Sequence, residues 1–233
     1  MPNADGRKDG VASGASLERE TPPGGVATSF TPDASAPAVP RARVLVAGVG
    51  YRNLRDHSVG IVVTERLASR TWPEDIDVVV EDLSYNPIAV AQRFDAESPE
   101  RRFARLVVVS GVARGGARWP GAITCYRWDG VLPSDRVIRR AMTEAITGTV
   151  SLDNTLIVGR HLGSLPEEVV VVEVEPAMHE FGDHFSTPVA IIFDELMERV
   201  ATLAVDDRAV GRLPRAPLGG GVPLRGGARD IPS

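Results

Sequence analysis

Runs of consecutive apolar residues predict the buried strands of this chain. Four such runs, largely without polar alternation, are typical of strands covered on both faces of a parallel sheet. They cover residues 44–47, 76–80, 106–109 and 168–174. Residues 121–128 alternate instead, which predicts an edge or antiparallel strand.

Between these runs, apolar residues recur at the spacing of amphipathic helices. The predicted helices cover residues 58–70, 87–94, 133–146 and 187–200, and residues 151–162 begin a further helix or turn. Strands that alternate with helices indicate an α/β fold, here a three-layer sandwich with a mostly parallel sheet and helices on both faces.

The two ends of the chain lack this periodicity. Residues 1–41 mix Gly, Ala, Ser, Pro and charges, and residues 206–233 repeat that composition. Such segments cannot bury enough apolar surface to offset the entropy of ordering. The sequence therefore predicts one α/β domain over residues 42–205, flanked by disordered tails at 1–41 and 206–233.

Composition narrows the range of partners. The 233 residues are 43% hydrophobic, enough for one medium core, and carry a formal charge of −5. That charge disfavours binding to nucleic acid or to an anionic membrane surface. No segment approaches the roughly 20 consecutive apolar residues of a membrane span. The only cysteine, Cys125, has no partner for an internal disulfide, so we expect a cytoplasmic protein.

The loop after the first strand is the strongest candidate for a functional site. Gly48 and Gly50 follow the strand at its carboxyl end, where ligands bind in open α/β sheets. One interpretation is a dinucleotide site, with Glu81 as the ribose-binding acid. However, Asn53 occupies the third glycine position and the helix begins too late for its amide groups to reach a pyrophosphate. Nucleotide binding is therefore the weaker alternative.

Followed to its end, this loop resembles the opening motif of the nickel-iron hydrogenase maturation endopeptidases. The motif positions are Gly48, Gly50, Leu54, Asp56 and Gly60. Further segments fall in the family's order and spacing: Glu81 with Asp82, residues 106–109 with Gly111, Pro120 with Gly121, residues 165–176, and Pro188. The resemblance implies a cytoplasmic α/β enzyme that recognises nickel in a hydrogenase large subunit and removes that subunit's C-terminal extension.

The resemblance also implies three metal-contacting positions, which here carry His57, Ser110 and Asp153. None keeps the family's residue type, because the family has an acid, an aspartate and a histidine in that order. One imidazole and one carboxylate remain with their places exchanged, and Asp56 could supply the second carboxylate. We therefore predict that His57, Asp153 and Asp56 contact the metal, while Ser110 marks a family position without a good ligand. No intrinsic cofactor is expected, since the nickel would belong to the client.

Two other interpretations of polar residues stay open. Ser110, His57 and Asp153 have the composition of a hydrolytic triad, although Ser110 lacks the glycine pattern of a nucleophile elbow. In the sequence HEFGDH, His179 and His184 could bind a metal, but their spacing fits no common motif, and we predict a solvated loop.

The sequence thus yields two main functional hypotheses. The first is a maturation-protease-like protein that acts on the C-terminal region of a hydrogenase large subunit precursor, with altered or lost proteolytic activity. The second is a non-catalytic, client-binding assembly factor of the same fold. Whether the chain is an enzyme, and which residue would be catalytic, stay open from the sequence.

Overall fold

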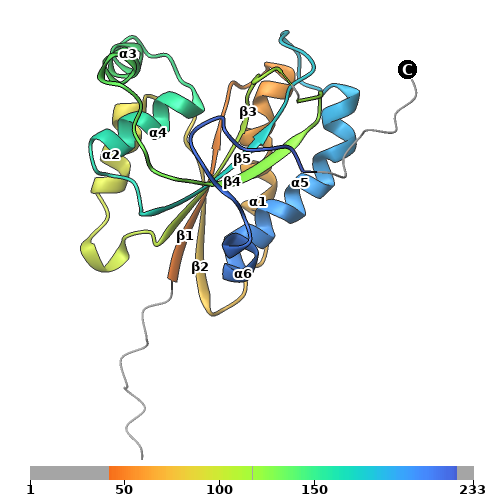
Figure 1. Cartoon of the computed structure of the whole chain (residues 1–233). Coiled ribbons are helices and arrows are strands. Elements are labelled where there is room, and N and C mark those ends of the chain that lie inside the picture. The colour runs from red at the N-terminus through yellow and green to blue at the C-terminus, as the bar shows by residue number, and fades with distance from the viewer. Residues whose placement is uncertain (1–41, 117, 225–233) are drawn as a thin grey trace, which may run out of the picture. The chain divides into compact units, whose positions relative to one another are not determined.

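The computed structural model describes residues 42–116 and 118–224. In this part of the chain, six strands form one sheet in the order β2-β1-β3-β5-β4-β6 (Figure 1). They are β1 (Ala42–Val49), β2 (Ile76–Asp82), β3 (Arg105–Gly111), β4 (Ile123–Trp128), β5 (Glu168–Val174) and β6 (Arg215–Ala216). β4 runs antiparallel to β5, and all other pairings are parallel. The predicted mostly parallel sheet is confirmed.

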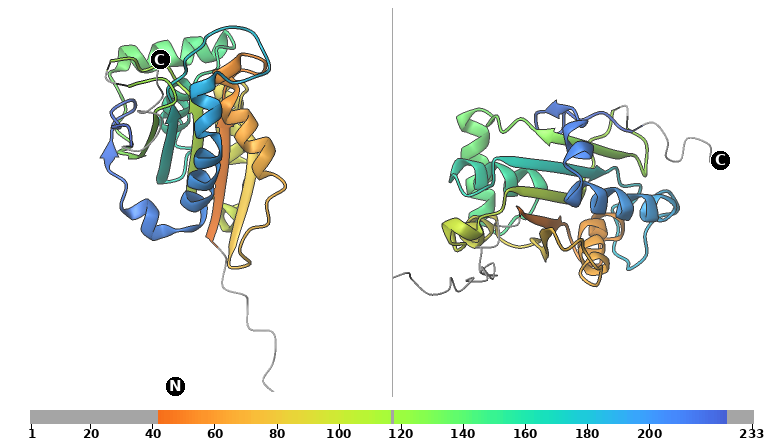
Figure 2. Two further views of the ribbon diagram at one scale, coloured as in Figure 1. Left: turned by 90° about the vertical axis from the view of Figure 1, so that its right-hand side faces the viewer. Right: turned by 90° about the horizontal axis from the view of Figure 1, so that it is seen from below.

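Helices cover both faces of the sheet, as predicted. α1 (Val59–Leu67) and α5 (Thr187–Val205) lie on one face. α2 (Pro87–Asp95) and α4 (Leu152–His161) lie on the other, with α3 (Asp135–Ile146) packed against α4. Figure 2 shows these layers from two further directions. Short 3-10 helices, η1 (Arg55–Ser58) and η2 (Pro99–Arg101), precede α1 and β3.

The core explains why the strand sequences are apolar without alternation. In β1, Val44 and Val46 join the cluster under α1 and α5, whereas Leu45 and Ala47 join the cluster under α2 and α4. Both faces of the strand are buried, so every position favours an apolar residue.

The predicted C-terminal boundary needs correction. Residues 206–224 are folded, and they form α6 (Asp207–Gly211) and β6. Val210 and Ala216 are buried, and Arg118 donates hydrogen bonds to the carbonyls of Gly219 (3.1 Å) and Gly221 (2.9 Å). A distant arginine binds this glycine-rich segment through its backbone, which composition cannot reveal. The predicted tail at residues 1–41 and the remainder of the C-terminal one, residues 225–233, lie outside the described residues.

No helix within residues 42–116 and 118–224 combines the length and apolar character that crossing a bilayer requires.

Candidate functional site

The glycines of the first loop allow close packing of backbone segments. A Cβ on Gly48 would lie 2.2 Å from the carbonyl oxygen of Gly60, and one on Gly60 would lie 2.4 Å from that of Val109. A Cβ on Gly50 would lie 2.2 Å from the carbonyl oxygen of His57. The glycines therefore let η1 and α1 approach the ends of β1 and β3. Since packing accounts for the motif, it gives no support to the nucleotide-binding interpretation.

This packing positions a cleft at the carboxyl ends of the parallel strands. The cleft has a volume of about 420 Å³. Its walls include all three family-equivalent positions, His57 from η1, Ser110 from β3 and Asp153 from α4. The loops at this edge of the sheet thus converge as the sequence predicted, although the chemistry of each position differs.

Asp56 does not line this cleft. It is completely buried, and its carboxylate accepts hydrogen bonds from the backbone amides of Ala177 (2.8 Å), Met178 (3.0 Å) and Ser186 (2.8 Å). The hydroxyl of Ser186 donates a fourth bond of 2.7 Å. The prediction that Asp56 substitutes as a metal ligand is therefore corrected: its oxygens anchor the loop between β5 and α5.

His57 points into the cleft, where both of its ring nitrogens have partners. Nδ1 lies 3.1 Å from the carbonyl oxygen of Gly111, and because a carbonyl only accepts, Nδ1 carries the proton. Nε2 then accepts a bond of 2.8 Å from Nδ1 of His179. Burial, followed by the proximity of His179, lowers the pKa of His57. The imidazole is therefore held neutral, in one tautomer.

Asp153 lines the cleft but is paired with a cation. Arg114 donates to both of its carboxylate oxygens, at 2.7 and 2.6 Å, and also to Glu173 at 2.7 Å. Burial alone would lower the pKa of Arg114, but the hydrogen bonds to Asp153 and Glu173 raise it overall. The guanidinium is thus permanently charged, and it neutralises the carboxylate that was predicted to bind metal.

Glu173 extends this pairing into the core. It is fully buried, and it accepts further hydrogen bonds from Arg118 and from the hydroxyl of Tyr126 at 2.9 Å. A buried carboxylate needs such partners, because an unpaired charge is strongly disfavoured in the interior. We call Arg114, Arg118, Asp153 and Glu173 the arginine–carboxylate cluster.

The donor set consequently does not fit the predicted metal site. Asp56 is turned into the protein, Asp153 is neutralised, and Ser110 is only 3% exposed. In the described residues, no three His, Cys, Asp or Glu side chains are grouped to hold a metal ion. Nor is a hydrolytic triad assembled, since both ring nitrogens of His57 bond to groups other than Ser110.

Comparison with known proteins finds likeness in fold. No family model matches the chain, and no curated protein matches its sequence. Among solved structures, the hydrogenase maturating endopeptidase HybD of Escherichia coli is 19% identical, with a TM-score of 0.48 over 78% of this chain and 97% of that one. The likeness is to hydrogenase maturation endopeptidases.

Two further structures of that kind are similar. The hydrogenase 2 maturation peptidase of a thaumarchaeon is 22% identical, covering 68% of this chain and 95% of its own, with a TM-score of 0.44. The [NiFe] hydrogenase maturation protease HybD of Thermococcus kodakarensis is 15% identical, covering 70% and 99%, with a TM-score of 0.43. These proteins carry the name of the family that the sequence motif resembles.

Sequence reasoning missed the partners that define the site. His179 lies in an exposed loop, as predicted, but its ring also reaches His57 across 122 positions, with ring centroids 4.6 Å apart, which the sequence did not indicate. Arg114 and Glu173 carried no motif. The only local signal was the presence of charged residues beside predicted strands, which does not identify their partners.

Proposed function

We propose that this chain is a maturation-protease-like protein that binds the C-terminal region of a nickel-iron hydrogenase large subunit precursor in the cleft, in the cytoplasm, without cleaving it. The observation that carries the proposal is the pairing of Asp153 with Arg114 at 2.6 and 2.7 Å. At one of the three family-equivalent positions, the carboxylate of Asp153 is paired with the cation of Arg114. A second position carries the hydroxyl of Ser110, which is nearly buried. This set lacks the free carboxylates from which a metal-guided peptidase would work.

The rim of the cleft supports binding of a polypeptide. Tyr51 lines the cleft and is 44% exposed, and its hydroxyl donates to the carbonyl of Val150. Met178 and Phe181, on either side of the cleft residue His179, are 42% and 87% exposed. Both belong to the loop that brings His179 to the cleft, and large exposed apolar side chains close together are typical of interaction sites.

A nickel ion carried by the client would contact the imidazole ring of His57. The carbonyl of Gly111 fixes the ring of His57 with Nδ1 protonated, so the lone pair that a borderline metal prefers is on Nε2. His179 covers that lone pair, at 2.8 Å, and a client would have to displace it. In this proposal His57 is the only one of the predicted ligands that contacts the client's metal, because Asp153 stays bound to Arg114.

Incubation with a nickel-loaded large subunit precursor tests the proposal. We expect a stable complex, and intact-mass spectrometry should find the precursor at its full length. A shortened precursor would overturn the non-cleaving role in favour of a peptidase. Absence of any complex would overturn the choice of client.

A matched pair of variants tests whether the rim forms the contact. Phe181→Ala should weaken the complex by about tenfold, because losing an aromatic side chain that anchors an interface typically costs ~1.4 kcal/mol or more. The control, Val131→Ala, removes an apolar side chain that is 66% exposed and does not line the cleft, so it should leave affinity unchanged. Equal effects of the two variants would place the client elsewhere.

The role of His57 has its own readout. His57→Ala should reduce the preference for nickel-loaded over nickel-free precursor while leaving binding of the nickel-free form intact. An unchanged preference would mean that His57 does not contact the metal.

A further inference from the structure

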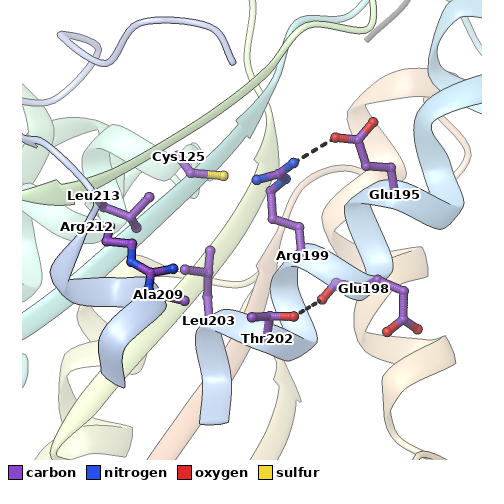
Figure 3. A pocket seen from close by; sticks show the side chains of 9 residues that line it. All are labelled: Cys125, Glu195, Glu198, Arg199, Thr202, Leu203, Ala209, Arg212 and Leu213. Carbon is purple, nitrogen blue, oxygen red and sulfur yellow. Dashed lines mark hydrogen bonds and ion pairs between the residues drawn. The ribbon is translucent and has the colours of Figure 1, made fainter. Parts of the chain in front are cut away.

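A second cavity lies away from the cleft, between α5, α6 and β4 (Figure 3). Its volume is about 450 Å³, and it shares no lining residue with the cleft. We call it the α5–α6 cavity. Its apolar part includes the sulfur-bearing side chain of Cys125 on β4, with Leu203 from α5 and Leu213 just after α6. The cavity exists because α5 packs on β1, β2, β3 and β5, while neither α5 nor the shorter α6 packs extensively on β4.

Two arginines bring positive charge to this apolar surface. Arg212 follows α6 and lines the cavity, and within the described residues its guanidinium has no hydrogen-bond or ion-pair partner. Arg199 on α5 donates to Glu195 through Nη2 at 2.8 Å, but its Nε is buried without a partner. Figure 3 shows the two guanidinium groups approaching from the α6 and α5 sides. The guanidinium of Arg212 is exposed to solvent and has no partner in the described part of the chain, and beside an apolar floor it is suited to a ligand that is anionic at one end and apolar at the other.

The acidic residues of the cavity limit the charge of that ligand. Glu195 is paired with Arg199, and Glu198 is paired with Arg70 at 2.7 and 3.1 Å. In Figure 3 the carboxylate of Glu198 is turned away from Arg199. A dianion such as a phosphate would meet repulsion from both glutamates, whereas a single carboxylate matches the planar fork of one free guanidinium.

We propose that the α5–α6 cavity binds a small monocarboxylate with an apolar body. The carboxylate accepts from the guanidinium of Arg212, and the apolar body lies over Cys125, Leu203 and Leu213. The volume is in the range of roughly 300–1,000 Å³ that is usual for small-molecule sites. This site is independent of the proposed client-binding function, because the two cavities have no residue in common.

Equilibrium dialysis of the full chain against radiolabelled octanoate tests the proposal. We expect saturable binding of one octanoate per chain, competed by excess unlabelled octanoate. Octanol, which has the same chain length without the charge, and inorganic phosphate should compete poorly. Absence of saturable binding would overturn the proposal, and so would equal competition by octanol or by phosphate.

Two variants with the same change of charge test where the ligand binds. Arg212→Gln should weaken octanoate binding by about tenfold, because it removes a charge-assisted hydrogen bond. Arg208→Gln makes the same charge change on α6 at an exposed residue outside the cavity, and it should leave the affinity unchanged. Equal affinities of the two variants would overturn the site.

Sedimentation of the full chain tests the competing occupant of the cavity, a second copy of the protein. We expect its oligomeric state to be the same in the wild type and in Arg212→Gln, with and without octanoate. Self-association that octanoate or the substitution disrupts would assign the cavity to a protein interface and overturn the ligand proposal.

Discussion

Adjacent residues of η1 have opposite roles. Asp56 points into the protein and joins the first loop to the segment between β5 and α5, whereas the ring of the next residue, His57, faces the cleft. The two side chains therefore cannot exchange roles through a small change of loop geometry. From η1 the cleft therefore receives one imidazole, which is paired with His179.

The pKa of His57 gives a prediction at this scale. Burial and then His179 lower it from the usual value of about 6.5, while the Gly111 carbonyl and Asp56 act in the opposite direction. His179→Asn should therefore raise the pKa of His57, measured by NMR titration of its ring. His161→Asn, an exposed histidine that does not line the cleft, is the control and should not change it. An unchanged pKa in His179→Asn would contradict the observed pairing.

The sign of the linked stability change follows from the lowered pKa. As the pH falls, His57 is protonated in the unfolded chain at a higher pH than in the folded chain. The contribution of neutral His57 to stability is therefore present above pH ~6.5 and is lost as the pH falls below that value. In His179→Asn, where the two values lie closer together, the loss on acidification should be smaller.

At the scale of elements, the contact between η1–α1 and the sheet depends on glycine. Gly48→Ala should lower the free energy of unfolding by about 1–3 kcal/mol, because the new methyl group overlaps the backbone of Gly60, which can yield only if α1 shifts. Gly211→Ala in α6 meets no atom within 4 Å and serves as the control, with an expected change below ~0.5 kcal/mol. Urea unfolding of both variants measures the difference, and equal stabilities would contradict this role of the motif.

The same scale explains which features the sequence could predict. Strands such as β1 were predictable because both of their faces join apolar clusters, so local pattern and tertiary environment agree. β6 was not, since two residues carry no periodicity and their partner strand lies 88 positions earlier, in the pairing of Arg127 with Arg215. A strand of that length is defined by its neighbour rather than by its own sequence.

The candidate site likewise has features that the sequence could predict and features that it could not. The convergence of His57, Ser110 and Asp153 followed from the rule that loops meet at the carboxyl edge of parallel strands. The pairing of Asp153 with Arg114 and that of His57 with His179 are contacts between side chains from separate loops. One sequence fixes neither the rotamers nor the loop paths that produce them, so the ligand set was predicted incorrectly at Asp56.

At the scale of the whole described domain, the C-terminal segment stabilises the far side of the sheet. A chain that ends at Val205, the predicted domain boundary, would lose α6, β6 and the carbonyls that Arg118 contacts. We expect its free energy of unfolding to fall by about 3 kcal/mol or more, since buried groups including Arg118 and Tyr126 would lose partners. For a chain of this size, that is a decrease of roughly 6–12 °C in Tm.

Calorimetry of two truncated chains measures this contribution. The control ends at Leu224, which keeps every one of these contacts, including the bond from the Leu224 amide to the carbonyl of Ile123 (2.9 Å). Equal midpoints of the two chains would contradict a stabilising role for residues 206–224.

The shortness of β6 has a consequence for how the protein behaves at high concentration. An exposed outer strand is a template on which another chain can add its own backbone, the first step of amyloid-like growth. Here the outermost strand beside β4 offers only Arg215 and Ala216, and the opposite margin, β2, ends in the acidic pair Glu81 and Asp82. One margin is too brief to seed such growth, and at the other an incoming strand would have to bury charged side chains, among them Glu81 with its partner Arg93, so the fold carries its own protection against fibril formation.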